Sequence, residues 1–493
     1  MVQFGFCQHK PGNHGASDCL WDIIFAVEFS SNPVRNQRMR QQKNLFTRRQ
    51  FLARSATVAG GLACGPAILR AGEPAATTPS ISSRLIFGTP LTHCDWMLKD
   101  NRPEVVPGIE GVRHMLSVCK AAGMAQVYWR VLDAGRAMYK SRLVLPAENY
   151  EFDQFYNPVT AEEKALLDSF HMDYQRRGHS NRSISEMISA LDYEHFDSFA
   201  AAVQVGHELG LEIHAWVTIN EDDHGWGAPS AFSRLWPEYR WVRRDGRPYR
   251  SQLSLAFPKV MEYKLGIIKE VLAYDLDGLF IDWLRTGDVR DNPQTDGDGV
   301  ADYGYEEPSV KGFQRKHGVD PHTLPNGDPR WVQFRAQPRT EFMRHVRKLA
   351  RARRKHLPLS VLVANPWCYR GLGDKIAGNL KGLLLDVGAW AHEGLIDAAS
   401  PAGYFKGGGS TEEACRALRK ETSDKIDIWP YEWVPKTPDE FAAQAARARA
   451  LGAKHILFWE ADYLDDPEAP ARQALGATMS AQAAPSRRAP RPQ

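Results

Sequence analysis

Short apolar runs alternate along the chain with longer segments in which apolar residues recur at helical spacing. Eight of these runs have the nearly continuous apolar character of strands buried on both faces: Arg84–Gly88, Ala125–Val131, Leu211–Val217, Gly278–Asp282, Leu359–Ala364, Leu395–Ser400, Lys425–Pro430 and Lys454–Trp459. Several intervening segments end at glycine, as helices often do, among them Val112–Ala122, Phe196–Leu209 and Phe441–Leu451. Eight alternations of strand and helix predict an α/β fold, a closed parallel (β/α)8 TIM barrel.

Two connections in this pattern are longer than ordinary barrel loops. Asp133–Glu194 follows the second strand and Arg285–Pro329 follows the fourth. Both belong to the end of the barrel where the strands finish, which is the end that binds substrate in barrel enzymes. We assign residues 84–480 to the barrel, residues 72–83 to a linker and residues 481–493 to a disordered tail, on their Pro, Ser, Ala and Arg content.

The N-terminal region, residues 1–71, has the pattern of a twin-arginine export signal. Arg48 and Arg49 precede Phe51 and Leu52, and a mostly small and apolar stretch follows to Ile68. That stretch is too short and too rich in Gly and Ala for a stable membrane span, so we expect a cleaved leader and no span in the remaining chain. Met39 is better placed than Met1 as the start of such a leader. The alternative is a chance arginine pair before a buried helix.

Composition narrows the class of protein. Of the 493 residues, 43% are hydrophobic and 25% are charged, which is ordinary for a soluble globular protein. The formal net charge of +3 comes from the leader, where nine Lys and Arg face three Asp and Glu. The remainder has 53 basic and 56 acidic residues, a formal charge of −3, so nothing indicates a nucleic-acid partner. The predicted twin-arginine signal, in turn, leads us to expect an exported protein, periplasmic or extracellular.

Carboxylates, aromatic rings, Asn and Arg gather at the carboxyl ends of the predicted strands, where barrel active sites are built. The candidates for substrate binding are Trp129, Arg130, His214, Trp216, Asn220, Glu221, Asp222, Arg285, Asn365, Trp433, Trp459 and Asp462. Indole rings can stack on the apolar faces of sugars, and bidentate polar groups can orient them. His214 lies inside an apolar strand, where a histidine is more often a hydrogen-bonded core residue than a ligand.

Three acids at strand ends are candidates for catalysis. Glycoside hydrolysis needs one protonated carboxylic acid and one ionised carboxylate, so a pair is required. Asp282 ends the fourth strand and is the first choice, with Glu432 or Glu460 as its partner. Which acid donates the proton stays open, and each has a structural alternative as the partner of an arginine or as a helix cap.

No metal or organic cofactor is expected. The chain has no His-Glu-x-x-His, no phosphate-binding loop and no dinucleotide fingerprint. Asp296, Asp298 and Asp302 are spaced like the first ligands of a calcium loop, although the Glu that completes such a loop is missing. They form a weak calcium candidate, with a solvated acidic loop as the alternative.

Several segments together resemble the bacterial glycosyl-hydrolase-like family 10 barrels. They are Gly210–Trp216, Trp236–Tyr239, Leu253–Val260, Asp277–Trp283, Trp390–Asp397 and Gly452–Glu460, in this order over roughly Leu85 to Asp466. The resemblance implies an exported (β/α)8 barrel that acts on glycans, with Asp282 as the family's strand-four acid. Trp283 stands where members of the family usually carry Asp or Tyr, so the resemblance does not predict the substrate.

These observations predict an exported glycoside hydrolase-like enzyme that cleaves a polysaccharide or oligosaccharide through paired carboxylates. A noncatalytic glycan-binding barrel at the cell envelope is the alternative. A calcium-stabilised surface or scaffold protein is a third possibility, which requires the three aspartates of the acidic loop to converge on one ion.

Overall fold

The structure is a computed structural model that describes residues 84–98, 108–133, 135–147, 191–222, 230–282, 284, 298–364, 378–402, 410–465 and 472–487. The chain divides into two units, Met1–Leu62 and Ala63–Gln493, and all described residues belong to the second. The predicted leader and linker therefore lie outside the described residues.

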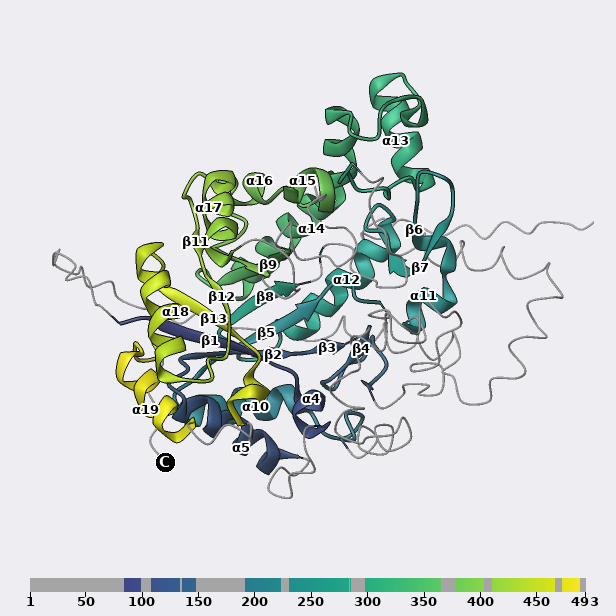
Figure 1. Cartoon of the computed structure of the whole chain (residues 1–493). Coiled ribbons are helices and arrows are strands. Elements are labelled where there is room, and N and C mark those ends of the chain that lie inside the picture. The colour runs from purple at the N-terminus through teal and green to yellow at the C-terminus, as the bar shows by residue number, and fades with distance from the viewer. Residues whose placement is uncertain are drawn as a thin grey trace, which may run out of the picture. The chain divides into compact units, whose positions relative to one another are not determined.

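The centre of the described part is a nine-stranded sheet in which every strand pairs in parallel (Figure 1). In chain order its strands are β1 (Ile86–Leu91), β2 (Gln126–Arg130), β5 (Glu212–Thr218), β8 (Gly278–Asp282), β9 (Leu359–Ala364), β10 (Ala398–Ala402), β11 (Asp427–Ile428), β12 (Tyr431–Trp433) and β13 (His455–Trp459). The sheet order β11-β10-β9-β8-β5-β2-β1-β13-β12 places β11 and β12 at opposite edges, yet only Trp429 and Pro430 separate them in sequence.

This short connection closes the sheet. The amide of Trp429 donates to the carbonyl of Ala399 on one side, at 3.0 Å, and the amide of Leu457 donates to the carbonyl of Pro430 on the other, also at 3.0 Å. β11 and β12 are thus two parts of one seventh strand that joins both edges, which makes the sheet a closed parallel α/β barrel of eight strands. The strand is divided at Pro430, which has no amide hydrogen to donate.

Helices cover the outside of the barrel (Figure 1). Those that lie between successive barrel strands, or after the last one, are α5 (Ile109–Ala121), α10 (Ser198–Glu208), α12 (Pro258–Val271), α14 (Pro329–Arg353), α16 (Val387–His392), α17 (Thr411–Thr422), α18 (Pro438–Ala450) and α19 (Arg472–Gln482). The remaining helices are α4 (His93–Leu98), α11 (Ala231–Leu235), α13 (Glu307–His317) and α15 (Gly378–Leu383), with 3-10 turns η3 (Pro237–Tyr239), η5 (Pro321–Thr323) and η6 (Ala461–Asp465).

Local sequence explains where several of these helices begin and end. Ser410 and Glu413 form a reciprocal capping box at the start of α17, and the Asp197 side chain accepts the Ala200 amide at the start of α10. After α10 the chain reverses at Gly210, whose φ of 69° is the left-handed conformation that glycine adopts without strain. These signals also explain why the predicted helix ends differ from the observed ones by only a few residues.

Large side chains fill the interior of the barrel. Side chains of a strand alternate between its two faces, so every second residue points inward. Tyr128, Trp216, Phe280, Leu362, Ala398, Ala402, Trp429, Tyr431 and Leu457 form one buried cluster there, with the partly buried Trp459 packed against it. The inward positions beyond this cluster lie at the two ends of the barrel, and they are the polar ones.

The connections at the strand ends carry insertions. A two-stranded ribbon, β3 (Leu132–Asp133) with β4 (Arg136–Ala137), follows the second barrel strand, and α13 and η5 follow the fourth, in the two segments predicted to be long. A further hairpin, β6 (Arg240–Val242) with β7 (Pro248–Leu253), follows the third and was not predicted. Its turn signal was nevertheless present, because Asp245-Gly246 is typical of tight hairpins and Gly246 has φ 86°.

The C-terminal segment differs from the predicted disordered tail. α19 extends to Gln482, whose carbonyl accepts the Leu85 amide at 3.2 Å, and the Ala484 amide then donates to the Leu85 carbonyl at 2.7 Å. The described chain continues to Arg487. Composition suggested disorder, but the backbone groups just before β1 offer hydrogen-bond partners that hold residues 482–484.

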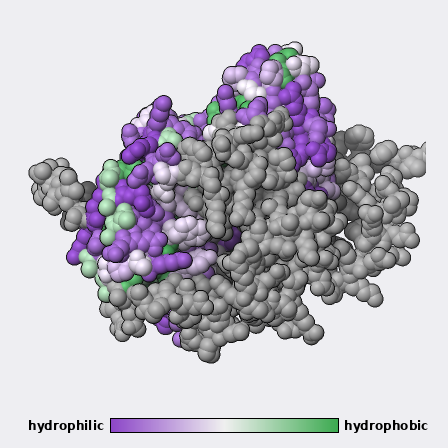
Figure 2. Space-filling model, viewed as in Figure 1, coloured by the Kyte–Doolittle hydropathy of each residue, from purple (hydrophilic) through white to green (hydrophobic). Residues whose placement is uncertain are grey.

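The surface of the described residues is mainly polar. In the view of Figure 2 it is mostly hydrophilic, with small and separate apolar patches. Ile109 and Trp433 are its exposed large hydrophobic residues, 37% and 43% exposed. No helix in the described ranges is long and apolar enough to cross a membrane.

Candidate active site

Asp282 lies at the carboxyl end of β8, inside the barrel end where the strands finish. It pairs in register with Thr218 at the end of β5, and its side chain is 1% exposed. The indole nitrogen Nε1 of Trp216, on the neighbouring strand, donates a hydrogen bond to its Oδ2 at 3.1 Å. An indole N–H can only donate, so Trp216 fixes this oxygen as an acceptor.

Trp216 in turn has an ordered environment. The guanidinium carbon of Arg130 lies 4.8 Å from the centre of the indole ring, and Trp459 packs against the ring edge to face with centroids 5.2 Å apart. Trp459 also stacks on Tyr431, at 5.4 Å. Side chains of β2, β12 and β13 therefore hold the Trp216 indole in place. Their rings also place an aromatic surface near the Asp282 carboxylate.

Arg130 is bound by acids rather than directed at solvent. Its Nη2 hydrogen-bonds with Glu221 and lies 2.9 Å from Oδ1 of Asp133, and its Nε donates to the carbonyl of Leu132 at 2.9 Å. Arg130 and Glu221 are 7% and 1% exposed. Arg130 and Glu221, both predicted to bind substrate, thus lie together beside Trp216. They form a buried ion pair that supports the site from behind.

Glu460 follows β13 directly. The Thr92 hydroxyl, just after β1, donates to its Oε1 at 2.6 Å, and the side chain of Glu460 is only partly buried. In the sheet order, β8 and β13 are separated by β5, β2 and β1. In a closed barrel of eight strands this puts Asp282 and Glu460 on opposite sides of the same end.

Glu432 is placed differently from its predicted role. Its neighbour Tyr431 points into the barrel, so Glu432 points outward, where Arg447 of α18 binds both of its oxygens at 2.7 and 2.8 Å. Burial raises the pKa of Glu432, and Arg447 opposes that shift. The structure therefore does not bring this acid together with Asp282, because it is paired with Arg447 in the helix layer.

Trp433 and Asp462 lie near the same end of the barrel. Trp433 ends β12, is 43% exposed, and meets Tyr463 edge to face at 6.2 Å. Asp462 is the second residue of η6, immediately before Tyr463. An exposed indole beside a tyrosine is the kind of surface on which a sugar ring stacks.

Three further candidates are held by contacts within the protein. Asp222 is fully buried and pairs with Lys264 at 2.8 Å. Trp129 points into the helix layer, where its Nε1 donates to the Ser198 hydroxyl at 3.3 Å. Asn220 donates from Nδ2 to the carbonyl of Leu284 at 3.0 Å. Asp222 and Trp129 are structural in this arrangement, whereas Asn220 lies close to the end of β8. Arg285 and Asn365 lie outside the described residues.

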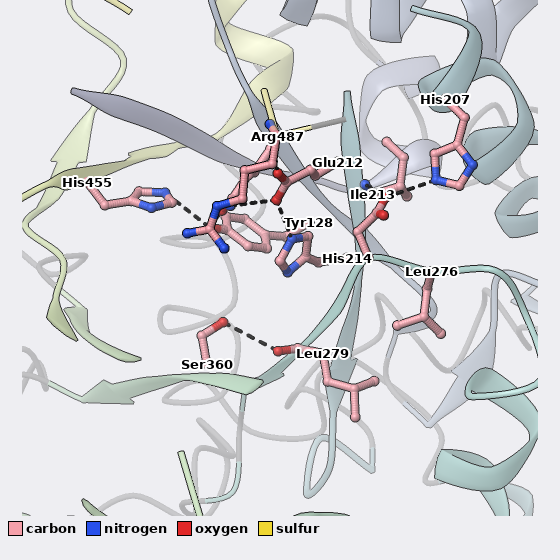
Figure 3. Close-up of polar contacts among 12 residues, drawn as sticks. Tyr128, His207, Glu212, Ile213, His214, Leu276, Leu279, Ser360, His455 and Arg487 are labelled. Carbon is pink, nitrogen blue, oxygen red and sulfur yellow. Dashed lines mark hydrogen bonds and ion pairs between the residues drawn. The ribbon is translucent and has the colours of Figure 1, made fainter. Parts of the chain in front are cut away.

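His214 lies towards the opposite end of the barrel from Asp282. It is level with Gly278, the first residue of β8, and its Nε2 is 3.5 Å from Oε2 of Glu212 (Figure 3). It belongs to a group that we call the N-terminal network, made up of Gln126, Tyr128, Glu212, His214 and His455. This position favours the core-histidine alternative over substrate binding.

Hydrogen bonds connect the N-terminal network. Gln126 donates to Glu212 at 2.9 Å and accepts from the Tyr128 hydroxyl at 2.8 Å, and that hydroxyl lies 3.2 Å from Nε2 of His455. The backbone amide of Arg487, from the C-terminal segment, donates to Glu212 at 3.1 Å (Figure 3). Burial alone would raise the pKa of Glu212, but its hydrogen bonds lower it.

The acidic loop offers no converging ligands in the described part of the chain. Asp302 is bound by Arg243 and by the Tyr249 hydroxyl, the latter at 2.9 Å, and Asp298 accepts the Val300 amide at 2.8 Å. Asp296 lies outside the described residues. Within the described ranges, no group of three or more His, Cys, Asp or Glu side chains is placed to hold a metal ion.

Glu306 is a buried acid that the sequence reasoning missed. It is 1% exposed, at the N-cap of α13, and burial raises its pKa to about 7 although Ser254, Arg339 and Arg335 favour the charged form. Acids are common at helix N-termini, so Glu306 and Glu307 before Pro308 looked like ordinary first-turn residues. No sequence signal set Glu306 apart, because its burial depends on the insertion after the third strand.

No family model and no curated protein matches the chain. Among solved structures, the chain is similar to the catalytic domain of β-amylase from Paenibacillus polymyxa, with 7% identity, 82% of this chain and 100% of that chain covered, and a TM-score of 0.48. It is also similar to a β-galactosidase from Marinomonas ef1, with 12% identity, 81% and 59% covered, and a TM-score of 0.46. A putative α-L-fucosidase from Bacteroides thetaiotaomicron matches with 11% identity, 85% and 99% covered, and a TM-score of 0.37.

The chain thus spans about three fifths of the length of that β-galactosidase. These similarities are too low to assign a reaction, and a barrel by itself implies none. The resemblance to glycosyl-hydrolase-like family 10 stays a prediction.

Proposed function

We propose that the protein is a glycoside hydrolase whose reaction takes place at the end of the barrel that carries Asp282. The observation that carries the proposal is the buried Asp282 carboxylate, 1% exposed and held by the Trp216 indole at 3.1 Å among the aromatic rings of β5, β12 and β13. A charged group at the end of a buried strand is costly unless it is used or paired. The family resemblance supports a glycan as the substrate.

Glu460 is the partner acid in this proposal. It follows the strand that lies opposite β8 in the barrel, and the Thr92 hydroxyl donates to its Oε1 at 2.6 Å, which orients the carboxyl group. Asp282, with a donor on Oδ2 and the Arg130 cation behind the indole, is suited to be the ionised carboxylate. Glu460 then protonates the leaving glycosidic oxygen, and Asp282 acts as nucleophile or as the base that activates water.

The test is release of reducing ends from a panel of bacterial, algal and plant polysaccharides. Asp282→Asn and Glu460→Gln are expected to lower the rate at least about hundredfold while the proteins stay folded. Glu432→Gln is the matched control, because it removes an acid of the adjacent strand that binds Arg447, and it should keep activity within a few-fold. If Glu432→Gln abolishes release and Glu460→Gln does not, the assignment of the partner is wrong.

The alternative of a noncatalytic glycan-binding barrel makes a different prediction for the same panel. It expects glycan binding without release of reducing ends by the unaltered chain. Binding that persists when no substrate is cleaved, in material that melts cooperatively, would favour it over the hydrolase.

Export through the twin-arginine route is the second part of the proposal. It rests on Arg48, Arg49 and the apolar stretch that follows them. Fractionation of cells that express the chain from Met39 should recover it outside the cytoplasm, and replacing both arginines by lysine should retain it inside. Equal distribution of the two forms would contradict this part without affecting the assignment of the reaction.

A further inference from the structure

Trp433 differs from the other large hydrophobic residues of the described ranges in its exposure. It is 43% exposed, and Ile109, at 37%, is the only other exposed one among them. In the view of Figure 2 the described surface is mostly hydrophilic. A single exposed hydrophobic side chain is ordinary, so the position of Trp433 decides whether its exposure has a function.

The backbone of Trp433 is held at the C-terminal end of the barrel. Trp433 ends β12 and pairs in register with Trp459 at the end of β13. The amide of the next residue, Val434, donates to the carbonyl of Trp459 at 3.2 Å. Gln444 of α18 donates from Nε2 to the carbonyl of Trp433 at 2.9 Å. The indole is therefore presented by a fixed strand end, which positions a binding side chain better than a loop does.

Tyr463 lies against this indole. The two ring centroids are 6.2 Å apart and the ring planes are 88° apart. Tyr463 belongs to η6, where its amide donates to the carbonyl of Glu460 at 3.1 Å, and its side chain is partly exposed. Two perpendicular rings enclose a corner, and we call Trp433 and Tyr463 the rim corner.

The rim corner adjoins the proposed active site on the side of Glu460. Trp459, the register partner of Trp433, comes directly before Glu460 in the chain. Neighbouring strands lie only about 4.8 Å apart, so Trp433 is one strand spacing from the residue that precedes this acid. Trp459 also packs on Trp216 at 5.2 Å, and Trp216 donates to Asp282 at 3.1 Å. Aromatic side chains thus continue from the rim corner to the carboxylate.

The size of the exposed surface selects the kind of partner. A tryptophan side chain buries about 150–250 Å² when it is covered, whereas a stable protein interface needs about 800 Å² on each side. One indole with one tyrosine is therefore too small to hold a protein or a second copy of this chain. It matches a single pyranose ring, whose apolar face stacks on an aromatic ring.

We propose that the rim corner binds a sugar unit on the leaving-group side of the bond that is cleaved. The substrate is then a glycan chain, and not a single sugar that carries a small group. This inference rests on the proposed function, in which Glu460 protonates the leaving glycosidic oxygen. The departing unit lies beside that acid, and Trp433 and Tyr463 stand on the same side of the barrel end.

The first experiment measures binding without requiring cleavage. The unaltered chain and Trp433→Ala are run in native gels that contain each polysaccharide of the panel. We expect at least one polysaccharide to retard the unaltered chain, and its affinity to be about five- to tenfold lower in Trp433→Ala, which loses one stacked ring. Trp433→Phe keeps a ring and should recover part of the affinity.

Ile109→Ala is the matched control. Ile109 is about as exposed as Trp433, but it begins α5 in the helix layer and has no aromatic ring. Its replacement should leave the affinity for the polysaccharide unchanged. An equal loss of affinity in both variants would show that the effect is not due to stacking at the rim corner, and would overturn the inference.

The second experiment tests the leaving-group side on a polysaccharide that is cleaved. Trp433→Ala should raise KM for this polysaccharide, because it removes binding of the departing sugar. The glycosyl fluoride of the released sugar has a single atom as its leaving group, so Trp433→Ala should turn it over with unchanged kcat/KM. Equal loss on both substrates would mean that Trp433 acts through the fold, and would overturn the inference.

The results for binding and for cleavage separate the two proposals. Binding that depends on Trp433, without release of reducing ends, would contradict the proposed hydrolase and support a glycan at the rim corner. Release of reducing ends with unchanged affinity and KM in Trp433→Ala would contradict only the rim corner. Failure of every polysaccharide to retard the unaltered chain, or a dimer in sedimentation that Trp433→Ala separates, would also overturn the inference.

Discussion

The two ends of the barrel carry similar side chains in different arrangements. At the N-terminal end, Glu212 accepts hydrogen bonds from Gln126 and from the Arg487 amide and lies 3.5 Å from His214. At the C-terminal end, Asp282 receives its donor from Trp216, and Glu460 lies on the far side with its own donor from Thr92. Glu212 is held by several hydrogen bonds of one network, whereas Asp282 and Glu460 follow strands on opposite sides of the barrel.

This difference shows how a barrel separates stability from chemistry. A stable interior requires polar groups that bind one another, and in the N-terminal network Gln126, Tyr128 and the Arg487 amide of the C-terminal segment supply such contacts around Glu212 (Figure 3). A reaction requires that at least two acids keep an oxygen for the substrate. Substitutions at the N-terminal end should therefore lower stability and keep activity, whereas substitutions at the C-terminal end should lower activity.

The largest expected effect is on the pH dependence of stability at the N-terminal end. Burial lowers the pKa of His455 to about 3 from 6.5, and His214 and Arg487 add to that shift. The histidine is neutral in the folded chain and takes up a proton on unfolding below pH 6.5. Its contribution to stability is thus present above pH 6.5 and is lost as the pH falls towards 3.

We expect His455→Gln to flatten this dependence. In the unaltered chain His455 alone accounts for about 1.4 kcal/mol per pH unit, on the order of 5 kcal/mol over the whole window from pH 6.5 to 3. The groups that face it are the Tyr128 hydroxyl at 3.2 Å, the Trp429 ring at 4.1 Å, His214 and Arg487. Urea unfolding at several pH values between 4 and 7 would measure the slope, and an identical slope in the variant would refute the assignment.

The second effect belongs to the C-terminal end. Trp216→Phe removes the indole donor to Asp282 and keeps most of the ring. A hydrogen bond to a charged group contributes about 1.5–3 kcal/mol, so turnover should fall about ten- to hundredfold if the bond is made in the transition state. The midpoint of thermal unfolding should fall as well, because the indole is buried, and kcat on the substrate found in the panel is the measurement.

Trp390→Phe controls for the loss of an indole hydrogen bond in general. Trp390 is 1% exposed and donates to the Thr340 hydroxyl at 3.0 Å in the helix layer. It should lose a comparable amount of stability without loss of turnover. Equal loss of activity in both variants would mean that Trp216 acts only through the fold.

The barrel itself was predictable from the sequence, because nearly continuous apolar runs such as Gly278–Asp282 and Leu359–Ala364 need both faces covered. The same pattern could not show that the seventh strand is divided, since Trp429 and Pro430 read as its end. The β6–β7 hairpin had a readable turn at Asp245-Gly246 that the strand count did not include.

The candidate site was predictable only as a set of strand ends. Alternation alone says that neighbours on a strand face opposite ways, but it does not say which of the two faces inward. Glu432 points outward because Tyr431, its neighbour on the strand, points into the barrel. Glu306 is buried because the insertion after the third strand covers it. Ion pairs such as Glu432 with Arg447 join residues of different elements and are set by packing that periodicity does not encode.

The smallest effect tests the closure of the N-terminal end. Ending the chain after Ala483 removes the Ala484 amide bonded to Leu85 and the Arg487 amide bonded to Glu212, at 2.7 and 3.1 Å. Two lost hydrogen bonds should lower the free energy of unfolding by about 1–3 kcal/mol, with turnover unchanged because both contacts lie away from Asp282. A chain that ends after Arg487 is the control and should match the full chain in both measurements. If truncation after Ala483 lowers kcat as much as stability, the two ends of the barrel are coupled, and the separation of stability from chemistry does not hold.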